Sequence, residues 1–136
     1  MSGEHSTAGG SSAKYVAKWD GTTWTPLGLG AGNWVRALGV FDDGSGPALY
    51  AGGTFATAGG SDAKRIAKWN GTNWAALDEG IQSFNSLVRV ISVFDDGHGA
   101  ALFAGGIYNN VGAANLSASD IARWDGRGWN ALGAGL

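Results

Sequence analysis

The sequence predicts an all-β protein built from repeated antiparallel units of four short strands. The chain has 136 residues with 25 glycines and only two prolines. Glycine at this density disfavours long helices, because each interior glycine costs about 1 kcal/mol relative to alanine. The phrase "AKYVAKWDGTTWTPLG" recurs as "AKRIAKWNGTNWAALD" and as "SDIARWDGRGWNALG". A second phrase, "VRALGVFDDGSGPALYAGGTF", recurs as "VRVISVFDDGHGAALFAGGIY".

These phrases repeat with a period of a little over fifty residues. Trp19, Trp69 and Trp124 are spaced by 50 and 55 residues, and Phe41 and Phe94 by 53. The leader "STAGGSSAKY" also matches "ATAGGSDAKR", again with an offset of 50. We therefore expect the chain to start inside a repeat.

The first predicted element is a hairpin over residues 15–27. Alternation over residues 15–19 places Tyr15, Ala17 and Trp19 on one face of a strand. The Asp-Gly that follows favours a tight hairpin turn, because both central residues of such a turn need positive φ.

The next unit, residues 35–77, supplies four predicted strands. Residues 35–41 and 48–55 are rich in β-forming side chains and are joined by "DDGSGP", a cluster of turn residues. Residues 65–69 and 74–77 form a second pair, joined by an Asn-Gly turn. Residues 88–132 repeat the whole unit.

Four strands per fifty-odd residues is the period of a propeller blade. "ALYAGG" and "ALFAGG" resemble the apolar run and glycine pair that end the second strand of a kelch repeat. "AKWNGTNWAAL" resembles the third strand, tight turn and Trp-led fourth strand of that family. Kelch repeats usually have Tyr where this chain has Trp69 before the turn, which makes it more similar to bacterial propeller repeats of the "WDGTxW" type. Integrin-type and lectin-type propellers are the alternatives.

This resemblance implies one repeat domain, residues 1–136, with about 2.5 β-propeller blades. Residues 13–33 would be an outer half-blade, 34–86 the first full blade and 87–136 the second. Closed propellers typically have 4–8 blades, and an isolated pair would expose apolar sheet faces. We therefore expect the ring to be closed by oligomerisation, with a dimer or trimer of identical chains as the main assembly, or the chain to be part of a longer protein.

Composition restricts the partners. The formal net charge of −2 provides no basic surface for nucleic acid. The absence of cysteine excludes disulfides and thiolate chemistry. We expect no membrane span, because no apolar stretch approaches 18 residues, and the polar opening "MSGEHSTAGGSS" is not a signal peptide. Localisation stays open, with an extracellular site expected if a parent protein is secreted.

Catalytic motifs are weak. The two "FDDG" phrases are interpreted as turns rather than calcium loops, because their acids are adjacent instead of alternating. "AGGTFATAGG" lacks the Lys-Ser/Thr of a phosphate-binding loop. His5 and His98 are the only histidines, and nothing aligns them with a nucleophile. We expect no enzyme, no catalytic residue, no cofactor and no metal.

Binding residues are predicted on the connections that change length between repeats, since loops on a rigid scaffold carry function. Leu27 and Val35 are eight residues apart, whereas Leu77 and Val88 are eleven apart. The candidate ligand-binding residues are Trp34, Asp78, Glu79, Phe84, Asn85, Tyr108, Asn109 and Asn110. Arg36 and Arg89 are candidates for lining a central channel, although pairing of each with the neighbouring blade is favoured.

Two functions fit these observations. The first is a non-catalytic β-propeller scaffold or protein-interaction module that self-assembles from multi-blade chains. The alternative is a lectin-like propeller with carbohydrate sites on the face that carries the long loops.

Overall fold

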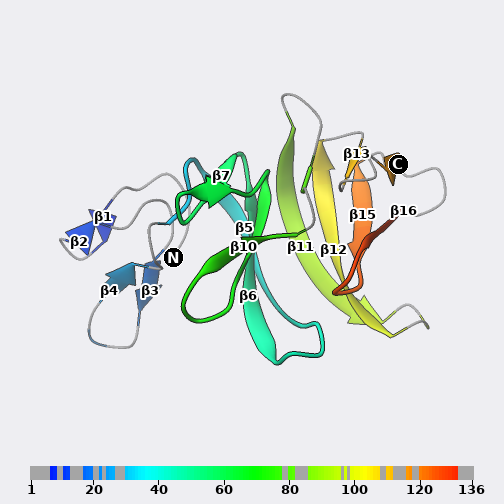
Figure 1. The fold of residues 1–136 in the computed structure, drawn as a ribbon, viewed down its shortest axis with the longest axis horizontal. Coiled ribbons are helices and arrows are strands. Elements are labelled where there is room, and N and C mark those ends of the chain that lie inside the picture. Colours follow the sequence, from blue (N-terminus) through cyan, green and yellow to red (C-terminus); the bar gives the residue numbers. More distant parts are fainter. Residues whose placement is uncertain are drawn as a thin grey trace.

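The computed structural model of the chain is all-β in the part it describes, with two antiparallel sheets side by side (Figure 1). It describes residues 7–8, 11–12, 17–19, 22, 24–26, 30–77, 80–81, 86–95, 97, 99–107, 110–111, 116–117 and 120–131. Within these ranges there is no helix, and so no helix that could cross a membrane. The all-β prediction is confirmed.

Each main sheet is formed by one repeat. The first sheet contains β5 (Val35–Asp42), β6 (Pro47–Gly53), β9 (Ile66–Trp69) and β10 (Trp74–Ala76), in that spatial order. The second contains β11 (Leu87–Asp95), β12 (Ala100–Ile107), β15 (Ile121–Trp124) and β16 (Trp129–Ala131), again in order. The four antiparallel strands expected per repeat are present in both.

Short hairpins accompany these sheets. β3 (Ala17–Trp19) pairs with β4 (Trp24–Pro26) where the first hairpin was predicted. Three further pairs were not predicted: β1 (Thr7–Ala8) with β2 (Ser11–Ser12), β7 (Thr57–Ala58) with β8 (Ser61–Asp62), and β13 (Asn110–Val111) with β14 (Leu116–Ser117). β7–β8 turns at Gly59 and Gly60, both with positive φ, as a two-residue type I′ turn requires.

The two sheets share an irregularity. The ladder between β5 and β6 skips Arg36 after Val35, and the ladder between β11 and β12 skips the equivalent Arg89. A β-bulge of this kind leaves one residue unpaired and increases the local twist. The repeats therefore match in register as well as in sequence.

Gly53 and Gly106 lie opposite these two bulges. A side chain at Gly53 would collide with the carbonyl oxygen of Trp34, and one at Gly106 with that of Leu87. Each position requires glycine because two backbones approach closely there.

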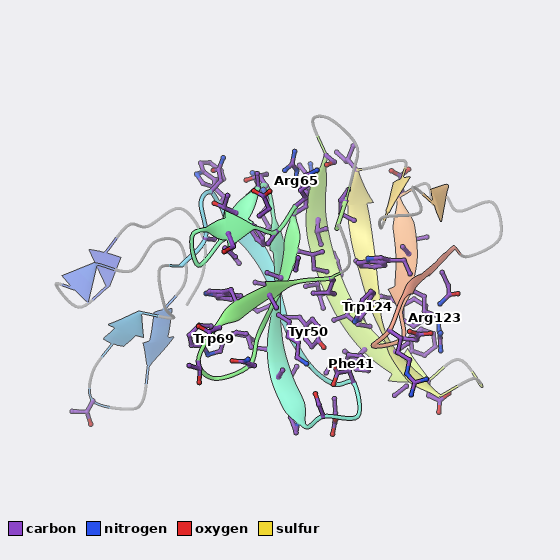
Figure 2. All side chains as sticks on the ribbon, in the orientation of Figure 1. Phe41, Tyr50, Arg65, Trp69, Arg123 and Trp124 are labelled. Carbon is purple, nitrogen blue, oxygen red and sulfur yellow. The ribbon has the colours of Figure 1, made fainter. Side chains whose placement is uncertain are left out.

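The main core lies between the sheets, where β11 is the neighbour of β5 and β6 (Figure 1). Its buried residues come from both repeats: Phe41, Ala48, Tyr50, Ile66, Leu77, Ile81, Val88, Leu102, Ala104, Ala122, Trp124 and Trp129. Figure 2 shows Phe41, Tyr50 and Trp124 gathered in this space. Each sheet therefore depends on the other for the burial of one face.

A second core covers the opposite face of the first sheet. Its buried members are Ala31, Val35, Ala51, Phe55, Ala58, Ala63 and Ala67, with Leu49, Trp69 and Trp74 packed against them. Residues 30–32 join it by pairing with β7, through hydrogen bonds from Gly32 N to Thr57 O and from Gly59 N to Gly30 O. The described strands form open sheets, and none of these sheets closes on itself.

Candidate interaction surface

The two sheets contact each other through opposite faces, and the alternation of side chains along each strand determines which residues lie on each face. We call the face of the first sheet that meets the second sheet its socket face; it includes Phe41, Gly39, Tyr50, Gly52 and Ile66. We call the face of the second sheet that enters this contact its knob face; it includes Val88, Ile91, Leu102, Ala122, Trp124 and Trp129. Consecutive repeats thus use opposite faces.

Two glycines of the socket face receive two apolar side chains of the knob face. A Cβ at Gly39 would lie 2.7 Å from Cγ2 of Ile91, and a Cβ at Gly52 would lie 2.5 Å from Cγ1 of Val88. Real Cβ atoms are not found that close to other carbons, so these two positions accept the neighbouring sheet only as glycine. Gly52 of the glycine pair therefore marks the close approach between the two sheets, whereas its neighbour Gly53 lies opposite the bulge of its own sheet.

Polar contacts fix the alignment of the two sheets. The indole Nε1 of Trp129 donates a buried hydrogen bond to the carbonyl oxygen of Leu77, at 3.1 Å. The guanidinium Nε of Arg65 donates to the carbonyl oxygen of Ser86, at 2.8 Å, just before the second sheet begins. Such directional bonds between buried groups permit one register where apolar packing alone permits several.

A charged cluster lies at the turn between β5 and β6. Lys68 Nζ forms an ion pair with Asp43 Oδ2 at 2.7 Å, and the Ser45 hydroxyl donates to Asp43 Oδ1 at 2.6 Å. The bond from Lys68 and then the bond from Ser45 hold the pKa of the Asp43 carboxyl well below its usual range. Burial, and then the nearby Asp43 carboxylate, raise the pKa of the Tyr50 hydroxyl. Asp43 therefore stays ionised and Tyr50 stays protonated at neutral pH, and the bonds to Asp43 fasten the turn to the sheet.

The two Asp-Gly turns are confirmed as turns. Asp42 Oδ1 accepts hydrogen bonds from the amides of Gly44 and Gly46, at 2.8 and 3.0 Å. Asp95 Oδ1 accepts the equivalent pair, at 2.8 and 3.1 Å. Within the described ranges no three acids or histidines gather in a group that would hold a metal ion.

The second sheet carries its own copy of the socket face, and among the described residues this copy is exposed along β11, at Val90, Ser92 and Phe94, whereas Phe103 of β12 is buried. Its members are Val90, Ser92, Phe94, Phe103, Gly105, Ile121 and Arg123. Phe94 stacks on Phe103 at 4.8 Å between ring centroids, as Phe41 packs on Tyr50 at 5.7 Å in the first sheet. Phe41 is 3% exposed beneath the second sheet, whereas Phe94 is 54% exposed.

Gly105 shows the same contrast. It is the counterpart of Gly52, but the nearest atom to a Cβ placed there is 3.9 Å away. No described side chain fills the space above it as Val88 does above Gly52. The second sheet therefore has a vacant position where the first sheet receives a neighbour.

The first sheet carries the complementary copy of the knob face, which the second core covers in part and which stays exposed at Leu38 and Val40. Its members are Val35, Leu38, Val40, Leu49, Ala51, Ala67, Trp69 and Trp74. Trp69 and Trp74 lie 5.3 Å apart, like Trp124 and Trp129 at 5.2 Å in the second sheet. Leu38 is 36% exposed, although its counterpart Ile91 packs between the sheets.

The predicted loop site is described only in part. Trp34 and Arg36 lie together at the start of β5, both exposed, with the guanidinium 4.9 Å from the indole centroid. Asn110 begins β13, and Arg89 is exposed at its bulge. The other candidates, Asp78, Glu79, Phe84, Asn85, Tyr108 and Asn109, lie outside the described residues, so their role and the lectin-like alternative stay predictions.

Sequence reasoning expected exposed apolar sheet faces on an isolated pair of units, but it named no residue on them and placed ligand binding on the loops. The signal for these faces was present as the exact correspondence of Phe41 with Phe94 and of Gly52 with Gly105 in the repeated phrase. Only the different exposures of Phe41 and Phe94 in the structure distinguish the socket face that is covered from the one that is exposed.

Comparisons of the chain with protein-family models, curated proteins and solved structures found no match. The class of the protein therefore rests on its own geometry. It is an all-β repeat protein whose two main antiparallel sheets pack through opposite faces, with a partly exposed copy of each face on the outside of the pair.

Proposed function

We propose that the chain is a non-catalytic β-propeller scaffold, in which each four-stranded sheet is a blade and several copies complete the ring. The observation that carries the proposal is the repeated interface. The socket-to-knob contact made once within the chain leaves two further faces: a socket face on the second sheet, exposed at Val90 and Phe94, and a knob face on the first sheet, exposed at Leu38 and Val40 beside the second core.

The exposed apolar surface gives this assembly its driving force. Phe94, Val90 and Leu38 are 54%, 57% and 36% exposed on these faces. Burial of a large apolar side chain is worth about 1.5–3 kcal/mol, and soluble monomers rarely leave contiguous apolar patches open. Docking of another blade on each face would remove this surface from water.

The number of blades limits the size of the ring. One chain has two full blades and the outer hairpin β3–β4, whereas closed propellers typically have 4–8 blades. Two copies provide four full blades and three copies provide six. A dimer or a trimer is therefore the expected assembly.

The test is the absolute mass in solution, measured by light scattering coupled to size-exclusion chromatography. We expect one discrete species at the mass of a dimer or a trimer. A folded monomer at every concentration would overturn the proposal, because the two vacant faces would then be stable in water.

A further inference from the structure

We infer that the vacant socket face of the second sheet binds the knob face of the first sheet of a second copy, head to tail, in the register of the contact inside the chain. The inference rests on the proposed function and specifies its interface. It identifies the partner as another copy of this chain and Leu38 as the residue that enters the position above Ser92.

The repeat register gives the residue correspondence. An offset of 53 residues relates Leu38 to Ile91 and Val35 to Val88 on the knob faces. The same offset relates Gly39 to Ser92 on the socket faces. A second copy docked in this register therefore places Leu38 opposite Ser92, as Ile91 is placed opposite Gly39.

One substitution between the repeats is compensated across this contact. In the internal contact, Cγ2 of Ile91 is the atom nearest to the space that a side chain at Gly39 would need. Leu38 has no branch at Cβ and so lacks this atom, and Ser92 has the side chain that Gly39 lacks. Because leucine and isoleucine have the same number of atoms, the compensation is one of shape: the space that Cγ2 of Ile91 takes opposite Gly39 is left to the Ser92 side chain opposite Leu38, as close packing of an interface demands.

The outer parts of the faces match in the same way. Trp69 and Trp74 repeat the tilted pair of Trp124 and Trp129, which packs in the core between the sheets. Both tryptophans of the first sheet are half-buried, so each retains surface for a further contact.

The polarity of the contact dictates the type of assembly. Each chain has one further face of each kind, exposed at Val90 and Phe94 on the socket side and at Leu38 and Val40 on the knob side, so the interface is heterologous and joins copies into a ring or an open chain. A two-fold contact between two socket faces would leave Leu38 exposed and would lack the fit of Leu38 to Ser92.

A disulfide trap tests the register, because the chain has no cysteine of its own. A Cβ at Gly39 lies 3.6 Å from Cβ of Ile91, within the range of about 3.5–4.5 Å found in disulfides. The double variant Leu38→Cys/Ser92→Cys should therefore crosslink between copies on mild oxidation. These two residues lie on opposite outer faces of the two-sheet stack, so they do not meet within one chain.

We expect non-reducing gels of the double variant to show covalent species up to the mass measured for the wild type, all reversed by reductant. The single variants Leu38→Cys and Ser92→Cys should remain uncrosslinked. The variant Gly39→Cys/Ile91→Cys is the matched internal control, with a disulfide inside one chain.

The outcomes separate the inference from the proposed function. Crosslinking of Ser92→Cys alone would indicate a socket-to-socket contact and overturn the inference. An assembled double variant that fails to crosslink would also overturn it and would point to another occupant, such as the β3–β4 hairpin, while the scaffold proposal stands. A wild type that is monomeric by light scattering would overturn both.

Discussion

The glycine pair that ends the second strand of each repeat does two separate jobs at adjacent positions. Gly52 leaves room for Val88 of the neighbouring sheet. Gly53 leaves room for the carbonyl oxygen of Trp34, which the bulge at Arg36 brings against it. The repeated "AGG" therefore records one contact between sheets and one contact within a sheet.

Replacement of Gly106 by alanine should destabilise the protein. The new Cβ would overlap the carbonyl oxygen of Leu87, and overpacking of this kind typically costs about 1–3 kcal/mol. Gly128→Ala is the matched control, because a Cβ there meets nothing within 4 Å. Urea denaturation should show a lower midpoint for Gly106→Ala and a nearly unchanged one for Gly128→Ala. Equal midpoints would mean that the bulge adjusts freely.

Acid should weaken the fold through Asp43. Because its pKa is lower in the folded chain than in the unfolded chain, the ion pair with Lys68 stabilises the fold above the ordinary carboxyl pKa of about 3.9. This stabilisation is lost as the pH falls from that value toward the folded pKa. It amounts to no more than about 1 kcal/mol, since both side chains reach solvent.

The variant Asp43→Asn should therefore be less stable than the wild type at neutral pH and lose less stability below about pH 4. Urea titrations at a series of pH values measure both effects. Asp62→Asn, at an exposed position in β8, is the control for loss of a surface carboxylate. Parallel pH profiles for Asp43→Asn and the wild type would show that the pair contributes nothing.

The turns, which depend on a few neighbouring residues, could be predicted from the sequence, whereas the pairing of distant strands could not. Asp42 and Asp95 were identified as turn residues because they stand in Asp/Gly clusters, and the structure shows the carboxylate of each accepting a bond from the amide two positions along the chain. The bulges at Arg36 and Arg89 had no such signal, because a bulge depends on which strand lies opposite.

At the scale of elements, the repeated phrases predicted the main strands but did not predict the two-residue strands. Strands β7 and β8 have two residues each, too few for alternation to show. Their turn was nevertheless present as Gly59-Gly60, a type I′ sequence. Arg65 and Asp120 adopt positive φ just before the third strand of each unit, where a glycine would have been expected.

The contact between Gly39 and Ile91 can be measured as an energetic coupling. Gly39→Ala should cost about 1–3 kcal/mol, because its Cβ would lie 2.7 Å from Cγ2 of Ile91. In the Ile91→Ala background that atom is absent, so the same change should cost at least about 1 kcal/mol less.

A double-mutant cycle from urea unfolding gives this coupling. Val93→Ala is the control partner. Val93 shares the strand and face of Ile91, but it pairs with Leu102 and remains 37% exposed. The effects of Gly39→Ala and Val93→Ala should add. Additivity for Ile91→Ala as well would contradict the packing of the two sheets through this position.

At the scale of the whole molecule, the sequence predicted how many units the chain contains but not which sheet faces are covered within one chain. Repeat spacing alone indicated two four-stranded sheets and an extra hairpin, as observed. The pattern is identical for a face that is covered and a face that is vacant. Phe41 and Phe94 are the same residue in the same phrase, and only packing distinguishes them.

This difference predicts that thermal stability depends on chain concentration. If copies associate through the vacant faces, binding of the folded state raises the free energy of unfolding by about 2.7 kcal/mol when the free chain concentration is a hundred times Kd. Differential scanning calorimetry of the wild type should therefore show Tm rising with concentration by several degrees.

Phe94→Glu should remove this dependence while leaving the Tm of dilute chains nearly unchanged, because Phe94 is 54% exposed in the single chain. Thr72→Glu, in the exposed turn after β9, adds the same charge away from both faces and should behave as the wild type. A wild-type Tm that does not change with concentration, in a sample shown to be monomeric, would mean that the second sheet tolerates its open socket face.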